Sequence, residues 1–454
     1  MSDIYSEITP QVTRLAKEAE KISLIDPEMY EKYEVKRGLR SISGKGVTAG
    51  LTEVSRVVGK QKEDGVYKPC NGRLFYRGID VSDLINGFYT EGRFGFEEAA
   101  YLLLFGSLPG EGELQRFSDL LKEYREMLPT NFVREIIMAC PSSNMMNVLA
   151  RSVLTLYAYD EQADDTAIPN VLRQCLQIIS MLPEISVYGY QIYQHYYNGK
   201  SLYIHPSNAS LSYSENILHL LRKDMQFSSL EARLLDIALV LHMEHGGGTN
   251  STFTTHVVSS SMTDTYSVFA ASLGSLKGPR HGGASVKVVQ MMEDLKKNVS
   301  DWKDEEEVAE YLRGILSREN FDHSGQIYGV GHAVYSLSDP RAEILRSYAK
   351  ILCEEKQISD EYNLYCLVDR LSPKVIGEKA RIYKGVCANV DFYSGFIFSI
   401  LNLPVELFTP LFAIARSVGW SAHRIEELSN HGKIIRPSYQ PIGDSKDYIP
   451  MKKR

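Results

Sequence analysis

The 454-residue chain has few of the features that mark several protein classes. It has only six cysteines and no Cys-x-x-Cys pair, which argues against a disulfide scaffold and against a thiolate zinc site. Its most apolar stretch, residues 396–415, is interrupted by Asn402, Pro404, Glu406 and Pro410, so we expect no membrane-spanning helix. Internal repeats and low-complexity tracts are also missing, and the composition is that of an ordinary globular protein.

The chain also has no excess of positive charge. Fifty Lys and Arg residues stand against 57 Asp and Glu, which leaves a net charge of −7. An acidic chain argues against nucleic acid or an anionic membrane as the main partner. Isolated thiols fit a reducing compartment, and the N-terminal residues lack the basic and apolar parts of a secretory signal. We therefore expect a cytoplasmic protein.

Most of the chain is patterned as helix, which predicts an all-α fold. The clearest helix is predicted over residues 228–242, where Ser228 and Glu231 form a capping-box pattern before a wide apolar face. Further helices are predicted at residues 265–277 and 284–295, and from the Asp339-Pro340 pair onward. Alternating, glycine-punctuated segments predict only a minor β element near the N-terminus, within residues 47–66 and 71–81.

Two segments combine histidines with glycines, which let a ligand approach an imidazole closely. The first, residues 242–248, ends an apolar helix with His242, Glu244 and His245; its alternative interpretation is a helix C-terminus whose histidines interact with the helix dipole. In the second, His281 lies just before a helix, whose positive end should keep the imidazole neutral. A neutral imidazole can donate a hydrogen bond to a developing enolate oxygen, although His281 could equally be a turn residue.

A third segment, residues 329–333, contains His332, and Arg341 follows it by 341 − 332 = 9 residues. Arg341 is expected in the first turn of a helix, where a cation is electrostatically unfavourable. A bound carboxylate in the fork geometry of the guanidinium would offset that cost. The alternative is a surface arginine paired with Asp339 or Glu343.

Three more residues complete the candidate set. Asp391 has apolar neighbours, which would raise its pKa and its basicity, unless it only caps a helix. Arg416 stands in an apolar run, so its charge must be paired or solvated, and Arg436 precedes a proline in an extended segment. Three histidines, one carboxylate and three arginines suit carbanion chemistry on a small acid with several carboxylates. The sequence contains no Gly-x-Ser-x-Gly, Walker or His-Glu-x-x-His motif, so it does not suggest serine-based hydrolysis or phosphate transfer.

The order of these motifs resembles the citrate synthase family. The matching segments are His-Met-Glu-His-Gly-Gly-Gly-Thr-Asn (242–250), Gly-Pro-Arg-His-Gly (278–282), Gly-Val-Gly-His-Ala-Val-Tyr (329–335), Asp-Pro-Arg (339–341), Asn-Val-Asp-Phe-Tyr-Ser-Gly (389–395) and Arg-Pro (436–437). Residues 72–80 and 96–103 are also similar, so the resemblance covers about residues 40–440. It is specific because the motifs occur in the family's order.

The resemblance implies a two-domain helical fold that works as a homodimer. A large domain would comprise residues 1–281 and 396–454, and a small domain residues 282–395. The implied reaction belongs to the tricarboxylic acid cycle: oxaloacetate condenses with acetyl-CoA, and hydrolysis of the thioester gives citrate and CoA. The CoA thioester is a substrate, so neither a cofactor nor a metal ion is expected.

The resemblance also implies a role for each candidate residue. Asp391 would remove a proton from the acetyl methyl, His281 would hydrogen-bond the thioester oxygen, and His332 would donate to the oxaloacetate carbonyl. Oxaloacetate would be bound by His245, Arg341 and Arg416. Arg436 would contact the substrate of the neighbouring subunit. The adenine of CoA would bind at Gly329, Val330 and Gly331. Because the methyl is a very weak acid, a base must act together with a hydrogen-bond donor.

Two departures from the family pattern concern CoA. Ala388 stands where many members have proline, and Ser336 stands where some have a basic residue that contacts a CoA phosphate, so no phosphate contact is carried over. A basic run could serve instead, or it could be a solvated face: Lys374, Lys379, Arg381 and Lys384.

Three other functions remain open from the sequence. A 2-methylcitrate synthase would use propionyl-CoA with the same residues, and one methylene gives only about 1–3 kcal/mol of discrimination. A metal hydrolase would use His242, Glu244 and His245, although their spacing is not His-x-x-x-His. A helical binding protein without catalysis is the third.

Overall fold

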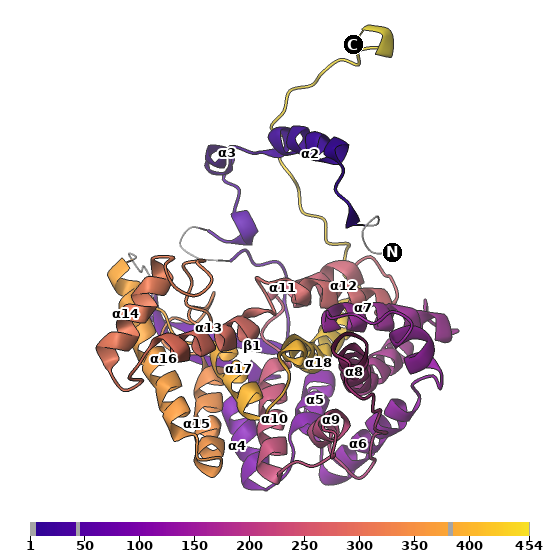
Figure 1. Cartoon of the computed structure of the whole chain (residues 1–454). Helices are drawn as coiled ribbons and strands as arrows, with labels where there is room; N and C mark the ends of the chain where they lie inside the picture. The colour runs from indigo at the N-terminus through magenta and orange to yellow at the C-terminus, as the bar shows by residue number, and fades with distance from the viewer. Residues whose placement is uncertain (1–5, 42–45, 380–384, 454) are drawn as a thin grey trace. The chain divides into compact units, whose positions relative to one another are not determined.

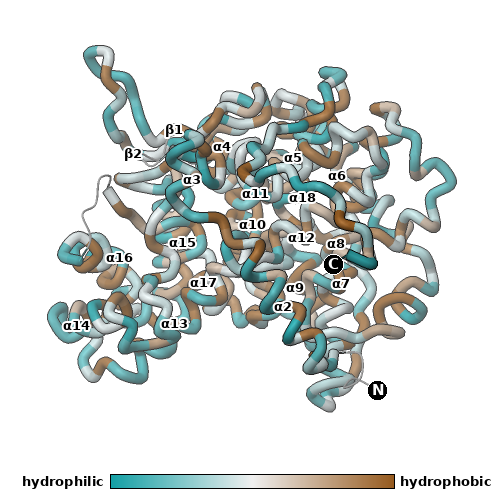
Figure 2. The backbone as a smooth tube through the Cα atoms, turned by 90° about the horizontal axis from the view of Figure 1, so that it is seen from above, coloured by the Kyte–Doolittle hydropathy of each residue, from teal (hydrophilic) through white to brown (hydrophobic). Residues whose placement is uncertain are grey.

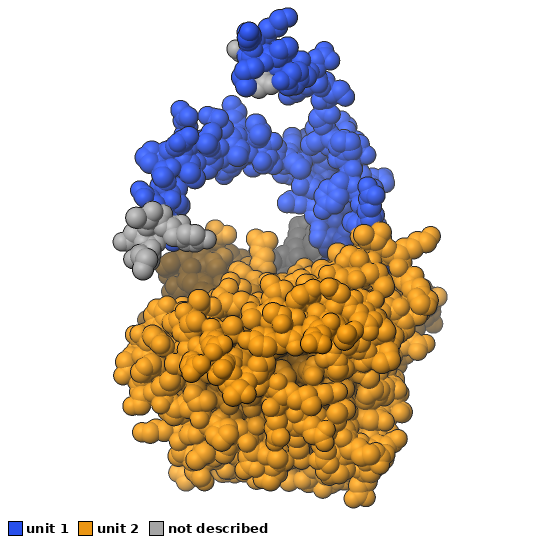
Figure 3. Space-filling model, turned by 90° about the vertical axis from the view of Figure 1, so that its right-hand side faces the viewer, with its two compact units in different colours: residues 1–49, 436–454 blue, residues 50–435 orange. Residues whose placement is uncertain are grey.

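The structure is a computed structural model that describes residues 6–41, 46–379 and 385–453. The chain forms two compact units, coloured separately in Figure 3: residues 1–49 with 436–454 (unit 1), and residues 50–435 (unit 2). Unit 1 contains α2 (Pro10–Ser23), α3 (Pro27–Lys32) and the short 3₁₀ helices η1 (Arg37–Leu39) and η5 (Met451–Lys453), none of which buries a residue.

Unit 2 is a helical body with one small sheet, as the sequence predicts (Figure 1). Its first part contains β1 (Ser55–Glu63), β2 (Val66–Tyr76), β3 (Ile79–Asp80), α4 (Val81–Thr90), α5 (Phe96–Phe105), α6 (Glu111–Glu126), η2 (Val133–Ile137), α7 (Met145–Leu156), η3 (Tyr157–Tyr159), α8 (Ile168–Asn198) and α9 (Tyr213–Leu221). Its second part contains α10 (Ser229–His242), α11 (Asn250–Ser259), α12 (Thr265–Lys277), α13 (Ala284–Asn298), α14 (Glu305–Leu316), α15 (Pro340–Glu355), α16 (Ser359–Lys379), α17 (Val390–Ile400), η4 (Val405–Leu407) and α18 (Phe408–Ser429).

The predicted helix boundaries agree well with the structure. Ser228 caps α10, and its hydroxyl and the side chain of Glu231 satisfy each other's backbone amides, as a capping box requires. Helix α12 has the predicted bounds, and α13 runs only three residues further than predicted. Asp339 caps α15, with Pro340 at the first helical position.

The β element is an antiparallel meander in the order β1-β2-β3. Its hairpin turns at Asp64-Gly65, both of which are left-handed with φ of 50° and 83°, so β2 begins at Val66 and not near Asn71 as predicted. A two-residue turn of this kind matches the twist of paired strands. The hairpin extends from the helical body and its tip is hydrophilic (Figure 2).

The helices of unit 2 form two groups with α10 and α18 between them (Figure 1). On one side α13 to α17 pack among themselves, and on the other α8 packs against α6, α7 and α9. Most residues of α10 and of α18 are buried. Among the residues that the structure describes, no helix is both long and apolar enough to cross a membrane.

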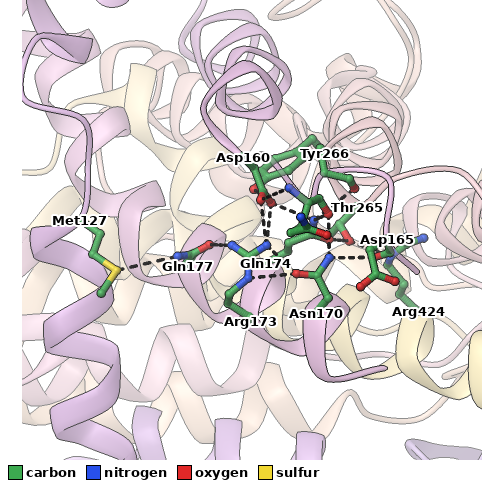
Figure 4. Close-up of polar contacts among 12 residues, drawn as sticks. Met127, Asp160, Asp165, Asn170, Arg173, Gln174, Gln177, Thr265, Tyr266 and Arg424 are labelled. Carbon is green, nitrogen blue, oxygen red and sulfur yellow. Dashed lines mark hydrogen bonds and ion pairs between the residues drawn. The ribbon is translucent and has the colours of Figure 1, made fainter. Parts of the chain in front are cut away.

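A polar network fixes α18 to its neighbours (Figure 4). The carboxylate of Asp160, at the start of the loop before α8, accepts hydrogen bonds from Arg173, Gln174 and Tyr266. These bonds outweigh partial burial and lower the pKa of Asp160 to about 2. Thr265 donates to Gln174 and accepts from the guanidinium of Arg424 on α18. The network therefore holds the helix that carries Arg416.

Candidate active site

His242 and His245 lie at and just beyond the end of α10 and have different surroundings. His242 ends the helix, where its Nδ1 lies 2.6 Å from the carbonyl oxygen of Ala238, and its ring is buried against Phe412. Burial lowers the pKa of His242 to about 3, so this residue is a neutral part of the core. The chain then turns at Gly246, whose φ of +88° favours glycine. His245 lies beyond the end of α10, whereas His242 Nδ1 contacts its own helix, so the helix-end interpretation applies only to His242.

His245 lies in a buried aromatic cluster. Its ring centroid is 5.0 Å from that of His332, and its Nε2 is 3.2 Å from the Tyr335 hydroxyl. Burial, and then the nearby Arg341 guanidinium, hold the pKa of His245 well below its usual range. The imidazole is therefore neutral at physiological pH.

The backbone sets the tautomer of His332. The amides of Val334 and Tyr335 both donate to its Nδ1, at 3.1 and 3.0 Å. A neutral ring that accepts at Nδ1 carries its proton on Nε2. His332 is thus arranged to donate a hydrogen bond from Nε2.

Asn389, a residue of the 389–395 motif for which the sequence indicates no role, positions both the His332 loop and Asp391. Its backbone amide donates to the carbonyl oxygen of Gly329 at 2.8 Å, and its side-chain amide donates to that of Gly331 at 2.9 Å. Its side-chain oxygen Oδ1 accepts from the Asp391 amide at 3.0 Å. Gly329 has a φ of +75°, and a Cβ there would lie 2.7 Å from a Val288 side-chain atom. Only glycine fits this position.

Asp391 has the environment of a base. Asn389 and not Asp391 caps α17, so the N-cap alternative for Asp391 is wrong. Oδ1 of Asp391 is buried and has no hydrogen-bond partner in the described part of the chain. Burial raises the pKa of Asp391 to about 6, although Arg341 and Arg416 oppose the shift.

Arg341 is held in a buried ion pair. Its Nε and Nη2 bind the two oxygens of Asp339 at 3.0 and 2.7 Å, and the arginine is only 3% exposed. The alternative interpretation is therefore correct about the pairing with Asp339 and wrong about the surface position, and the contact with a bound carboxylate stays a prediction. Asp339 raises the pKa of Arg341 against the effect of burial.

Arg416 is a buried cation that forms no ion pair with the described residues, although the carboxylates of Glu244 and Asp391 are near enough to act on its pKa. Its Nε donates to the carbonyl oxygen of His242 at 2.8 Å, and its guanidinium lies 4.8 Å from the centroid of the Phe412 ring. It is 1% exposed, and burial lowers its pKa to about 10. A buried charge of this kind is costly until an anion binds beside it.

His281 completes the set from the turn between α12 and α13. Its Nε2 accepts the Ser251 amide at 3.2 Å and lies 2.9 Å from the Ser251 hydroxyl, so the neutral ring carries its proton on Nδ1. Burial, with Arg416 nearby, lowers the pKa of His281 to about 4. The neutral state agrees with the prediction, but its main cause is burial and not the helix end. Ser251, which Trp420 also contacts at 3.3 Å, is a second positioning residue that the sequence did not reveal.

The remaining candidates are a residue of unit 1, a buried serine and a basic run that the structure describes only in part. Arg436 is an exposed residue of unit 1, and its role stays a prediction. Ser336 is buried, so it is not available for a contact with a CoA phosphate at the surface. In the basic run, Lys379 donates to the Leu316 carbonyl, while Arg381 and Lys384 lie outside the described residues.

The predicted hydrolase ligands do not converge. His242 Nδ1 is engaged by its own helix, Glu244 forms a buried pair with His423 at 3.0 Å, and His245 faces Tyr335. Within the described ranges they form no cluster that could hold a metal ion.

The structure therefore brings six predicted residues near enough to interact electrostatically. His245, His332 and Asp391 interact with one another or with the cations Arg341 and Arg416, and His281 interacts with Arg416. Two arginines suit a dianion, two neutral histidines present protons on opposite nitrogens, and one carboxyl has a raised pKa. Such a set can remove a proton from carbon while stabilising the resulting enolate.

Comparisons with known proteins find relatives over most of the chain. A profile of the family described as "Citrate synthase, C-terminal domain" matches residues 40–438. The citrate synthase of Synechocystis sp. is 33% identical over 413 residues, which cover 90% of this chain and 92% of that protein. The 2-methylcitrate synthase of Shewanella oneidensis is 29% identical, covering 90% and 97%. The Thermoplasma acidophilum citrate synthase in ternary complex with carboxymethyl coenzyme A and oxaloacetate aligns with a TM-score of 0.73, at 25% identity, covering 92% and 99%.

Proposed function

Because the chain belongs to the citrate synthase family, we propose that its buried cluster binds oxaloacetate and enolises acetyl-CoA beside it. The reaction is the condensation of oxaloacetate with acetyl-CoA and hydrolysis of the thioester to citrate and CoA. The observation that carries the residue assignment is Arg416, a buried guanidinium with no ion pair among the described residues. An anion with two carboxylates placed between Arg416 and Arg341 offsets its charge.

Enolisation uses Asp391 and His281 together. Asp391, with its unpartnered buried oxygen and raised pKa, takes a proton from the acetyl methyl. The Nδ1–H of His281 donates to the thioester oxygen as negative charge develops there, because Nε2 is engaged by Ser251. The neutral imidazole stabilises the enol without transferring a full proton.

Carbon–carbon bond formation uses His332. Its Nε2–H donates to the oxaloacetate carbonyl oxygen, which gains charge as the enol attacks. His245, Arg341 and Arg416 hold the oxaloacetate, and Gly329, Val330 and Gly331 line the adenine site. The citryl thioester is then hydrolysed. These steps require neither a cofactor nor a metal ion, since the CoA thioester is a substrate.

We expect kcat/KM for acetyl-CoA to fall about tenfold per pH unit below a pH near 6. Burial raises the pKa of Asp391 to about 6, so the carboxyl is protonated below that pH and cannot accept the methyl proton. His281, with a pKa lowered to about 4, stays neutral over most of this range. The measurement is the pH profile of the initial rate between pH 4.5 and 8, and a rate that stays level to pH 4.5 would contradict the assignment.

The division into a large domain (1–281 and 396–454) and a small domain (282–395) is part of this proposal. The mutual packing of α13 to α17 supports it, and Gly282-Gly283 lies in the turn that leads into this group. The second boundary falls inside the continuous helix α17. His332, Arg341 and Asp391 would then belong to the small domain, and His245 and Arg416 to the large one. A ligand that contacts both sides favours a closed state.

A homodimer with a shared site predicts complementation between two inactive variants. Arg436→Leu removes the residue proposed to reach the neighbouring subunit's substrate, and Asp391→Asn removes the base. Each mixed dimer then has one site with both residues intact, so full subunit exchange should restore about a quarter of wild-type activity. The rate is measured after exchange has been verified with differently labelled subunits. No recovery would remove Arg436 from the partner's site.

The similarity to a 2-methylcitrate synthase makes propionyl-CoA the second candidate substrate. Comparing kcat/KM for acetyl-CoA and propionyl-CoA, both with saturating oxaloacetate, tests the proposed function. We expect a preference for acetyl-CoA; a preference for propionyl-CoA would assign the chain as a 2-methylcitrate synthase. We also propose a cytoplasmic location, which the six scattered cysteines support, since isolated thiols suit a reducing compartment.

A further inference from the structure

A second cluster of histidines and carboxylates lies between α11 and α18, which pack against each other (Figure 1). His256 is on α11, and His423 and Glu426 are on α18. His256 Nε2 is 3.1 Å from His423 Nδ1, and His423 Nδ1 is 3.7 Å from Glu426 Oε2. The three ligand atoms all lie within 4.8 Å of one another, and none belongs to the proposed catalytic residues.

We propose that His256, His423 and Glu426 form a binding site for a divalent transition-metal ion of the zinc type. Metal–nitrogen bonds of roughly 2.0–2.1 Å to two nitrogens 3.1 Å apart subtend an angle of about 98°. The 3.7 Å separation of nitrogen and oxygen corresponds to about 127° with the same bond lengths. Both angles lie in the range around tetrahedral geometry, and two imidazoles with one carboxylate are ligands that zinc accepts.

The far nitrogen of each histidine faces a carboxylate, as is usual around bound zinc. His256 Nδ1 is 2.7 Å from Glu427 Oε2, and His423 Nε2 is 3.0 Å from Glu244 Oε1. A carboxylate at the far nitrogen holds a proton there, but against the effect of burial Glu244 and Glu426 also raise the pKa of His423 to about 9, so without a metal a proton on His423 Nδ1 lies between the two rings and a metal ion has to displace it. Two facing lone pairs 3.1 Å apart repel each other unless a proton or a cation lies between them.

Charge and access also favour a cation. Three carboxylates, those of Glu244, Glu426 and Glu427, surround the two imidazoles. Oε2 of Glu426 is buried and accepts no hydrogen bond from any described residue. The side chains of His256 and Glu426 keep 13% and 14% of their surface exposed, so an ion can reach the site without unfolding.

An ion at this site would join α11 to α18 and lie behind the active-site loop. Glu244, the partner of His423, also accepts the amide of Gly246 at 2.5 Å and so fixes the turn after His245. Gly247 faces the same cluster, and a Cβ there would lie 3.3 Å from His256 Nε2. The role we infer is therefore structural, and the expected signature is a higher thermal midpoint with bound metal.

The test is calorimetric titration of the chelator-treated, untagged protein with zinc chloride. We expect one zinc ion per chain, with affinity reduced 100-fold or more in His256→Gln and in Glu426→Gln, which keeps the acceptor oxygen used by the Glu53 amide. Glu427→Gln should weaken binding about 10–100-fold, since it removes only the outer partner of His256. His195→Gln, at an exposed histidine of α8, is the matched control and should bind as the wild type does.

Anomalous diffraction from a zinc-soaked crystal makes the result independent of variant stability. A peak about 2.0–2.1 Å from both His256 Nε2 and His423 Nδ1 would support the proposal. No stoichiometric binding by the wild type, unchanged binding in both ligand variants, or a peak beside His245 and His332 instead would overturn it.

Discussion

Asp391→Asn should lower kcat for citrate formation by about 10²–10⁴-fold, the usual contribution of a general base. Asparagine has the shape of aspartate but cannot accept the methyl proton. The variant should keep its fold, because Asn389 caps α17 and Oδ1 of Asp391 has no hydrogen-bond partner among the described residues that the change would remove. Its thermal midpoint should therefore stay at or above that of the wild type. The measurement is the initial rate of CoA release with both substrates saturating.

Asp369 provides a matched control for this change. It is a mostly buried carboxyl of α16 whose pKa is also raised by burial, and it accepts a hydrogen bond from Tyr393 at 2.8 Å. Asp369→Asn alters a similar buried carboxyl outside the proposed site, so kcat should stay close to wild type. If Asp391→Asn kept most of the wild-type turnover, Asp391 could not be the base.

His281→Gln should lower kcat by about 10²–10³-fold, as the loss of one oxyanion donor does. A glutamine amide reaches the position of Nε2 and can keep the contact with Ser251, but it supplies no donor at the position of Nδ1. His281→Asn places an amide near Nδ1 and should retain more activity, although it loses the contact with Ser251. The two variants separate the chemical role of the ring from its structural role.

The readouts for the His281 pair are kcat for acetyl-CoA and KM for oxaloacetate. KM for oxaloacetate should change little, since Arg341, Arg416 and His245 are intact in both variants. The opposite order, with His281→Gln active and His281→Asn inactive, would place the donating proton on Nε2 and contradict the assigned tautomer.

The sequence predicted the residue types of the site better than their contacts. His245, His281, His332 and Asp391 stand in short motifs whose glycines and apolar neighbours already indicate close ligand approach and a raised carboxyl pKa. The structure adds the tautomers of His281 and His332, which backbone amides determine. No local pattern could show the tautomer of His281, because the Ser251 amide is 30 residues away in the chain. The amides that set the tautomer of His332 are only two and three residues away, but their direction depends on how that loop folds.

Positioning residues were missed for the same physical reason. Asn389 bonds to Gly329 and Gly331, about 60 residues earlier, and the pair of His256 and His423 is separated by 167 residues. Contacts of this kind depend on tertiary packing, which the local periodicity of a sequence does not reveal. The start of β2, in contrast, is indicated by the local sequence. Asp64-Gly65 is a typical two-residue hairpin turn, and it predicts that the strand begins at Val66.

The most direct test of the account is to identify what the purified chain makes from acetyl-CoA labelled with ¹³C in the methyl group. With oxaloacetate present, the account predicts one free CoA thiol for each oxaloacetate consumed, and the label in a methylene carbon of citrate by NMR. Without oxaloacetate, no CoA thiol should be released. The enol that Asp391 helps to form then has no electrophile to attack, so the thioester is not consumed. CoA release without oxaloacetate, with the label in free acetate, would make the chain a thioester hydrolase and contradict the account.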